Sequence, residues 1–249
     1  MTSTALVALL IIVISGLMMA GFAVLARRTK FVFREINAFK SIRRSVSMVV
    51  EDGSRLHVSL GRGSLLAPFG AAALAGLAML RRLAEITSTS DRPPFATSGD
   101  PLINLLAQET LGAAHDVVQP EKPFDPNYGR LTGLTPFSYA AGALPYIRED
   151  EVSTNVLIGN YGVEIALLTE ASEREGAAII AASDNLPAQA VLYAATPGSL
   201  IGEELFAAGA YHQGGDFHTA SLVVQDVLRW ILIIVILAGI ILKLVGVPL

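Results

Sequence analysis

The sequence predicts an α/β domain, made of a β-hairpin and a βαβ unit with extra helices, between an N-terminal and a C-terminal transmembrane helix. Three observations predict this fold class. A long apolar run lies at each end of the chain, residues 45–60 alternate between apolar and polar side chains, and residues 154–182 show a strand, helix and strand pattern. The length of 249 residues allows one or two domains.

Both ends of the chain are long and apolar enough to cross a membrane. Residues 5–26 carry no charge, and residues 230–242 carry none either. A helix rises about 1.5 Å per residue, so about 20 apolar residues span the apolar core of a bilayer. A cleaved signal peptide is the alternative for the first run, but no Lys or Arg precedes that run. The expected divisions are residues 1–4 outside, transmembrane helices at 5–26 and 229–247, a cytoplasmic domain at 27–228, and residues 248–249 outside.

Basic residues flank the apolar runs on the side of the central domain. Cytoplasmic segments next to membrane spans are enriched in Lys and Arg, so this pattern predicts a cytoplasmic domain with both termini outside. Such side chains also suit anionic lipid headgroups. Those nearest to the two spans, and therefore expected at the headgroups, are Arg27, Arg28, Lys30 and Arg229.

The alternation over residues 45–60 predicts a β-hairpin. The apolar residues of its two strands share one face only if a three-residue loop, residues 51–53, joins the strands. This register predicts a type I turn followed by a bulge, with Gly53 in the left-handed conformation.

An Ala/Gly/Leu-rich helix is expected from Ser64 to about Ile86. Its charge-free core, residues 64–80, is at the lower length limit for a span, and a buried or membrane-surface helix is favoured over a third span. The Gly61-Arg62-Gly63-Ser64 turn before it follows a strand, which is a setting for phosphate binding. The third glycine of a dinucleotide fingerprint is replaced by Leu66, so a tight turn that needs glycine is favoured over nucleotide binding.

A Pro- and aromatic-rich stretch, residues 116–147, follows a helix that begins at Asp100-Pro101 and runs to about Ala114. The stretch is long for a loop inside a compact domain. We expect an arm that is either disordered or docked, and its aromatic residues favour docking on a neighbouring subunit.

The last third of the domain predicts a parallel βαβ unit. Strands are expected at 154–159 and 177–182, and the amphipathic helix 163–175 between them ends at Gly176. A helix with Pro187 in its first turn and a further helix over about 200–210 follow.

Polar residues come directly after both strands of this unit. Open α/β sheets bind ligands beyond the carboxyl ends of their strands, so a small polar ligand could bind here. Helix capping by Asp184 or Asn185 is the favoured interpretation of those two residues. The ligand-binding candidates are Asn160, Tyr161, Ser183, Asp184 and Asn185.

Two imidazoles and a carboxylate lie within seven residues ahead of the second apolar run. His212, Asp216 and His218 could converge on zinc or iron(II). Their spacing is not the i, i+4 pair of a zinc-binding helix, and a polar hinge is an equally good interpretation.

Three stretches carry a resemblance to a known family: residues 106–111 (LAQETL), 159–170 (GNYGVEIALLTE) and 202–211 (GEELFAAGAY). In these stretches the chain resembles a bacterial integral-membrane protein family known only as a domain of unknown function. The resemblance implies the two-span architecture and a bacterial source, hence a bacterial inner (cytoplasmic) membrane. It implies no activity and no catalytic residue.

Several classes of function find no support in the sequence. The chain has no cysteine, which excludes disulfides, thiolate catalysis and Cys-ligated metal sites. A G-x-S-x-G nucleophile elbow is absent. Basic residues cluster only near the membrane, which argues against nucleic-acid binding. No cofactor and no catalytic residue is expected.

These observations favour a non-enzymatic, membrane-anchored scaffold that forms homo-oligomers through its cytoplasmic domain. Two anchors suit lateral association in a lipid bilayer, and Ala/Gly-rich helices with few charges need a surface to pack against. The alternative is a membrane-tethered sensor or small-ligand binding subunit that uses the strand-end loops near residues 160 and 184. An enzyme that depends on His212 and His218 ranks third.

Overall fold

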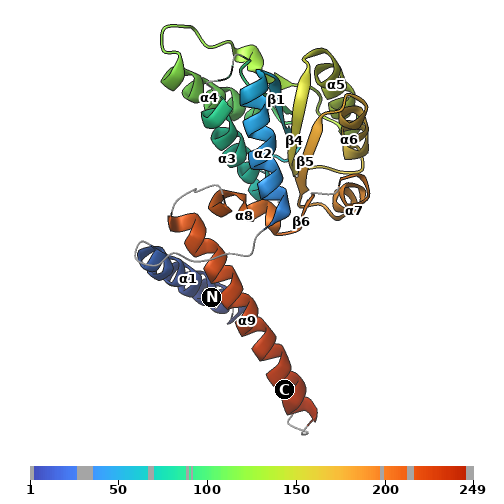
Figure 1. Ribbon diagram of the computed structural model, residues 1–249. Coiled ribbons are helices and arrows are strands. Elements are labelled where there is room, and N and C mark those ends of the chain that lie inside the picture. Colours follow the sequence, from blue (N-terminus) through green and yellow to red (C-terminus); the bar gives the residue numbers. More distant parts are fainter. Residues whose placement is uncertain are drawn as a thin grey trace. The chain divides into compact units, whose positions relative to one another are not determined.

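In a computed structural model the chain forms two compact units, Glu35–Ala208 and Met1–Arg34 with Gly209–Leu249 (Figure 1). The structure describes residues 3–26, 36–66, 70–87, 90, 92–196, 199–211 and 216–244.

The smaller unit contains two long apolar helices, α1 (Ser3–Ala26) and α9 (Asp216–Leu244), which contact each other. Thr4–Ala26 and Thr219–Leu244 are long and apolar enough to cross a membrane, and few of their residues are buried by protein. Two terminal helices that could span a bilayer agree with the sequence-based expectation. The second helix, α9, begins at Asp216, whereas the second span was expected to begin at residue 229.

The larger unit is built on a six-stranded, fully parallel sheet in the order β3-β2-β1-β4-β5-β6. Parallel sheets are covered by helices on both faces, so their strands are buried on both sides. The strands are β1 (Arg55–Gly61), β2 (Phe95–Ser98), β3 (Gly129–Leu131), β4 (Val152–Asn160), β5 (Ala178–Ser183) and β6 (Leu200–Ile201).

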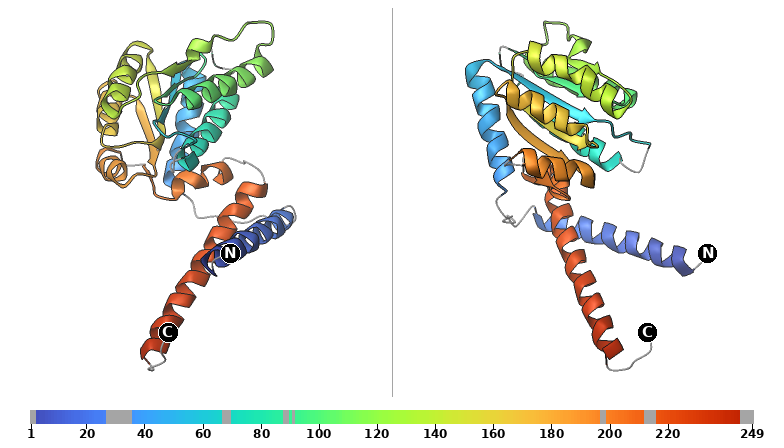
Figure 2. Two further views of the ribbon diagram at one scale, coloured as in Figure 1. Left: turned by 180° about the vertical axis from the view of Figure 1, so that it is seen from behind. Right: turned by 90° about the vertical axis from the view of Figure 1, so that its right-hand side faces the viewer.

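Two groups of helices cover the two faces of this sheet (Figure 2). The first group is α2 (Asn37–Asp52), α3 (Gly70–Thr87) and α4 (Pro101–Val118); the second is α5 (Pro136–Glu149), α6 (Ile165–Arg174) and α7 (Leu186–Ala195). A short 3-10 helix, η1 (Pro126–Tyr128), precedes β3, and α8 (Glu204–Tyr211) follows β6. The helix expected from Ser64 is therefore α3, a domain helix that begins at Gly70.

The β-hairpin expected over residues 45–60 is wrong. Residues 37–52 form helix α2, and only the second half of the proposed hairpin is a strand, β1. Phe39, Ile42, Val46 and Val49 are buried at helical spacing, whereas Met48 is exposed. Gly53 does adopt the expected left-handed conformation, with φ of 61°, but as the C-cap of α2 rather than in a hairpin bulge.

The expected arm over residues 116–147 is also corrected, because most of it belongs to the domain. It contains η1, strand β3 and most of helix α5. Tyr139 of α5 is fully buried in a cluster with Leu157, Tyr161 and Leu168, so its aromatic ring packs within its own chain. Pro145 lies inside α5.

Other expected elements are confirmed close to their predicted bounds. β4, α6 and β5 form the parallel βαβ unit, and Gly176 after α6 has φ of 67°. The Asp100 carboxylate caps α4 by accepting a hydrogen bond from the Ile103 amide at 3.0 Å, with Pro101 in the first turn.

Candidate ligand site at the carboxyl edge of the sheet

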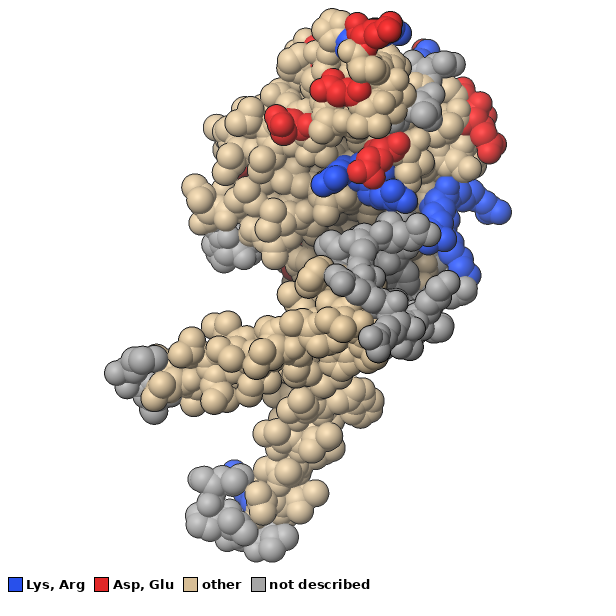
Figure 3. All heavy atoms as spheres, turned by 90° about the vertical axis from the view of Figure 1, so that its left-hand side faces the viewer, with Lys and Arg blue, Asp and Glu red and all other residues tan. Residues whose placement is uncertain are grey.

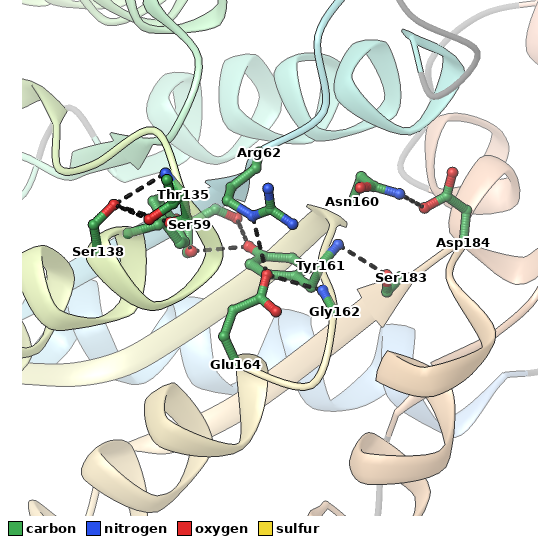
Figure 4. A network of polar contacts seen from close by, with 11 residues as sticks. Ser59, Arg62, Thr135, Ser138, Asn160, Tyr161, Gly162, Glu164, Ser183 and Asp184 are labelled. Carbon is green, nitrogen blue, oxygen red and sulfur yellow. Dashed lines mark hydrogen bonds and ion pairs between the residues drawn. The ribbon is translucent and has the colours of Figure 1, made fainter.

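The strand order reverses direction between β1 and β4. From β1 the chain adds β2 and β3 on one side, and then crosses back to add β4, β5 and β6 on the other. In open parallel sheets, ligands bind outside the carboxyl ends of the strands at such a switch point. Here the loops that meet at this point are residues 61–64 after β1 and residues 160–164 after β4 (Figure 4).

The ends of β1 and β4 approach each other so closely that they need glycine. The Arg62 amide donates a hydrogen bond to the Asn160 carbonyl oxygen at 2.9 Å. Gly61 has φ of 67°, and a Cβ placed on it would lie 2.4 Å from the same oxygen. This geometry is the tight turn that the glycines of residues 61–64 suggested.

An ion pair bridges the switch point. Arg62 Nε lies 3.1 Å from Glu164 Oε1, and the Glu164 side chain is 1% exposed while that of Arg62 is 24% exposed. The same carboxylate oxygen accepts a hydrogen bond from the Gly162 amide at 2.9 Å (Figure 4). Glu164 therefore fixes both the guanidinium and the loop that follows β4.

The aliphatic part of Arg62 lies over the turn that follows β2. A Cβ on Gly99 would be 2.6 Å from Arg62 Cγ, and the Gly99 amide donates to the Gly61 carbonyl oxygen at 2.8 Å. The carboxyl ends of β1, β2 and β4 are thus held together around one arginine.

The strand-end residues predicted from the sequence do lie close together. Asn160 Nδ2 donates to Asp184 Oδ1 at 2.8 Å, which joins the ends of β4 and β5. Ser183 is buried, and its hydroxyl oxygen accepts hydrogen bonds from the Tyr161 and Asn185 amides, each at 3.3 Å. Asn185 is the N-cap residue of α7, without a capping bond from its side chain.

Tyr161 differs from the other four, because its ring points into the core. It is fully buried, and its hydroxyl donates to the Ser59 carbonyl oxygen at 2.6 Å. The Tyr139 hydroxyl lies 2.5 Å from the Ser59 hydroxyl. Burial raises the pKa of both tyrosines, so both stay protonated and lock the loop after β4 onto β1.

His57 lies below this edge, in the middle of β1. Its Nε2 is 2.9 Å from Thr97 Oγ1, and its ring stacks on Phe95 with 4.6 Å between centroids. Burial lowers its pKa from 6.5 to about 3, so the imidazole is neutral at physiological pH. It packs inside the sheet and does not reach the switch point.

Most of the candidate metal ligands and headgroup contacts lie outside the residues, or the side chains, that the structure describes. His212, Arg27, Arg28 and Lys30 lie outside the described residues. Asp216 and His218 are in the first turn of α9, and their side chains are likewise not described. Within the described ranges there is no group of three or more His, Cys, Asp or Glu side chains that could hold a metal ion. Arg229 lies on α9, with its guanidinium 3.6 Å from Asp226.

Sequence reasoning did not select Arg62 or Glu164 as site residues, although both stretches were noted for other reasons. The pair joins positions 102 residues apart, so no local pattern shows it. A basic residue within a glycine-rich turn that directly follows a buried strand is the signal that could have singled out Arg62.

One family model covers the whole chain. The model, described as DUF6754, a domain of unknown function, matches residues 1–249. No curated protein and no solved structure matches the chain.

Proposed function

The chain belongs to this family of unknown function, and we propose that it is a membrane-anchored binding protein that holds a small anionic ligand at the switch point between β1 and β4. The observation that supports this proposal is the position of Arg62. It lies at the reversal of strand order, partly exposed and held by Glu164.

An anion is the favoured ligand because Arg62 is the one basic residue among the loops that follow the six strands. A guanidinium has five N–H donors in a rigid fork, and the bond to Glu164 uses one of them. The fork matches carboxylates and phosphates, which accept two parallel hydrogen bonds from it. Asn160 and Asp184, which are hydrogen-bonded to each other at the same edge, would bind hydroxyl groups of the same ligand.

We propose binding without chemical turnover. The imidazole of His57 is neutral and fully buried within the sheet, and the Tyr139 and Tyr161 hydroxyls are buried in hydrogen bonds to Ser59. These three buried side chains stabilise the carboxyl edge of the sheet and are not free to act on a ligand. A sensor or a binding subunit is the role that fits such a site.

The test is a ligand screen on the full chain in detergent, read as the unfolding temperature. The probes are inorganic phosphate, nucleoside mono- and diphosphates, and small dicarboxylates. At least one should raise the unfolding temperature, and Arg62→Gln should weaken its binding about 10–100-fold, because charge-assisted bonds contribute about 1.5–3 kcal/mol. Arg174→Gln is the matched control, since Arg174 forms an exposed pair with Glu170 on α6. No stabilisation by any probe, or equal binding by Arg62→Gln, would contradict the proposal.

Homo-oligomerisation remains a second proposal, favoured by exposed apolar surface along α4. Leu105 is 62% exposed and Val117 is 82% exposed, and a groove of about 550 Å³ runs between α3 and α4 beside Val117. We propose that a second copy packs on this side, with the domain in the bacterial cytoplasm and the termini outside. Light scattering of the detergent-extracted chain should give a mass of several copies; a monomer would exclude the scaffold role.

A further inference from the structure

A second pocket of the domain lies at the amino ends of the strands, at the edge of the sheet opposite to Arg62. Its volume is about 300 Å³, at the lower end of the range of small-molecule sites. The ends of α3 and α4, the segment before β2 and the segment between α4 and β3 bound it. Because these helices follow β1 and β2, they return to the amino edge, and the pocket shares no residue with the Arg62 site.

Flat and rigid rings form much of the wall of this pocket. Phe124 and Tyr128 line it with their ring centroids 6.0 Å apart, and Pro93, Pro94 and Pro123 add three proline rings. Proline and aromatic side chains have few rotamers, so a wall of this kind loses little entropy when a ligand binds. The faces of aromatic rings carry partial negative charge, which attracts a cation.

The C-terminal ends of two helices meet at the pocket. Ala84 in the last turn of α3 and His115 in the last turn of α4 both line it. The last carbonyl groups of a helix lack partners within the helix, and together with the helix dipole they favour a cation nearby. Neither of these two last turns contains Lys or Arg. Both helix ends therefore favour a cation that comes from outside the helices.

Carboxylates add to the negative potential around the pocket. Asp125 is exposed and lines the pocket, and Asp116 and Glu121, both exposed, are next to lining residues in the sequence. Figure 3 shows one face of the domain, with acidic side chains toward its upper part. Lys122 also lines the pocket and carries the opposite charge. The charges and the helix ends together make a cation a better occupant than an anion.

His115 contributes a buried nitrogen without a partner. Its Nδ1 forms no hydrogen bond with any residue that the structure describes, and Oδ1 of Asp116 lies 3.6 Å from it, too far for such a bond. Buried polar atoms are rarely left unpaired, because this costs free energy. In the Nε2–H tautomer, Nδ1 is an acceptor, and an ammonium group has three N–H donors to offer it and the carboxylate.

We propose that this pocket binds a small primary ammonium ion with an apolar body. The body packs between the aromatic and proline rings, and the charged group lies toward the ends of α3 and α4 and toward Asp125. The domain then has two sites of opposite preference, one for an anion at the carboxyl edge and one for an organic cation at the amino edge.

The test is isothermal titration calorimetry on the full chain in a maltoside detergent, which carries no charge. Three probes share one ring and differ in charge: benzylammonium, benzyl alcohol and benzoate. Hexylammonium and hexanol repeat the comparison with a linear body. At least one ammonium probe should bind about tenfold or more tightly than its neutral analogue, and benzoate should bind more weakly than either ring analogue.

Three variants assign the binding to this pocket. Phe124→Leu keeps an apolar wall without a ring, so it should weaken ammonium binding about 3–10-fold and leave benzyl alcohol unchanged. Asp125→Asn keeps the cap on the Asn127 amide, which Asp125 Oδ1 accepts at 2.9 Å, and should weaken ammonium binding about 2–5-fold. Lys122→Gln removes a repelling charge and should tighten ammonium binding by about the same factor. Glu173→Gln, an exposed acid elsewhere on the amino edge, is the matched control and should change nothing.

The sign of each effect separates the possible occupants. Equal binding of ammonium probes and their neutral analogues would overturn the proposal, since the pocket would then select only apolar bodies. Tighter binding of benzoate, or weaker ammonium binding by Lys122→Gln, would overturn it in favour of an anion. Absence of heat with every probe would overturn it as well. Arg62→Gln should leave these titrations unchanged, so the result does not depend on the ligand at the switch point.

Discussion

At the scale of single residues, the sheet buries several polar side chains, and most of them are hydrogen-bonded to a neighbour, although His57 Nδ1 and Asn155 Oδ1 have no partner among the described residues. His57 and Ser59 on β1 face Thr97 and Tyr139, and Asn155 on β4 donates to the Ser172 hydroxyl at 2.6 Å. Buried polar groups cost free energy unless they are hydrogen-bonded. This row of bonds therefore fixes how helices α5 and α6 sit on the sheet beneath the candidate site.

His57 makes the stability of the folded domain depend on pH. Its pKa is 6.5 when unfolded and about 3 when folded, because burial disfavours the charged imidazolium. Above about pH 6.5 neither state is charged, and the residue leaves stability unchanged. As pH falls below that value the unfolded state takes up a proton that the folded state cannot, so stability is lost at up to about 1.4 kcal/mol per pH unit.

We expect His57→Gln to flatten this part of the pH profile. The free energy of unfolding of wild type should fall more steeply than that of His57→Gln between about pH 6 and about pH 4. Denaturant titrations of both proteins at several pH values measure the difference. Parallel curves would show that the folded domain accepts the imidazolium at this position.

The site shows which residues could be found from sequence. Asn160, Ser183 and Asp184 follow apolar strands, so their place at a common edge could be read from the pattern of the βαβ unit. Arg62 and Glu164 could not be paired in this way, because the pairing depends on β1 and β4 being neighbours. That adjacency follows from the order of all six strands, which a single sequence does not display.

At the scale of elements, α2 shows why the local pattern misled. Over residues 46–50, Val46, Met48 and Val50 alternate as a strand would, while Val46 and Val49 also fit a helix. The segment forms a helix because a helix can pack its buried face on the sheet. A helix here covers β1, β4 and β5 on the sheet face shared with α3.

Two substitutions distinguish the helix from the rejected hairpin. Val49→Ala should destabilise the domain by about 1–3 kcal/mol, because Val49 is 1% exposed and its loss leaves a cavity. Met48→Ala should change stability by less than about 0.5 kcal/mol, because Met48 is 54% exposed. A hairpin predicts the reverse order, since it would bury Met48. Thermal or denaturant unfolding of the two variants makes the comparison.

Helix α5 was missed for a different physical reason. Pro136 and Pro145 both lie within it, and proline density alone suggested a loop. Pro136 takes the first helical position, where its missing N–H is not needed. The capping arrangement of Thr135 with Ser138, 2.7 Å between hydroxyl oxygens, marks the start of the helix. Burial of Tyr139 then outweighs the disturbance from Pro145.

At the scale of the whole molecule, the two apolar ends and the βαβ unit were predictable because each is a long, local pattern. The parallel pairing of β4 with β5 and the end of α6 before Gly176 were predicted correctly. Strand β3 has three residues and β6 has two, which is too short for any periodicity to appear. Their place in the sheet is set by neighbouring strands and helices rather than by their own side chains.

The central place of β1 affects how the chain can be made. β1 is paired with β2 on one side and with β4 on the other, and β4 ends at Asn160. At about 5–20 residues per second, the roughly 100 residues after Gly61 take on the order of 5–20 s to synthesise. Throughout that interval one edge of β1 has no strand to pair with, and such an edge invites association with other chains. A ribosome that stalls before residue 152 would leave the nascent chain with this edge of β1 unpaired.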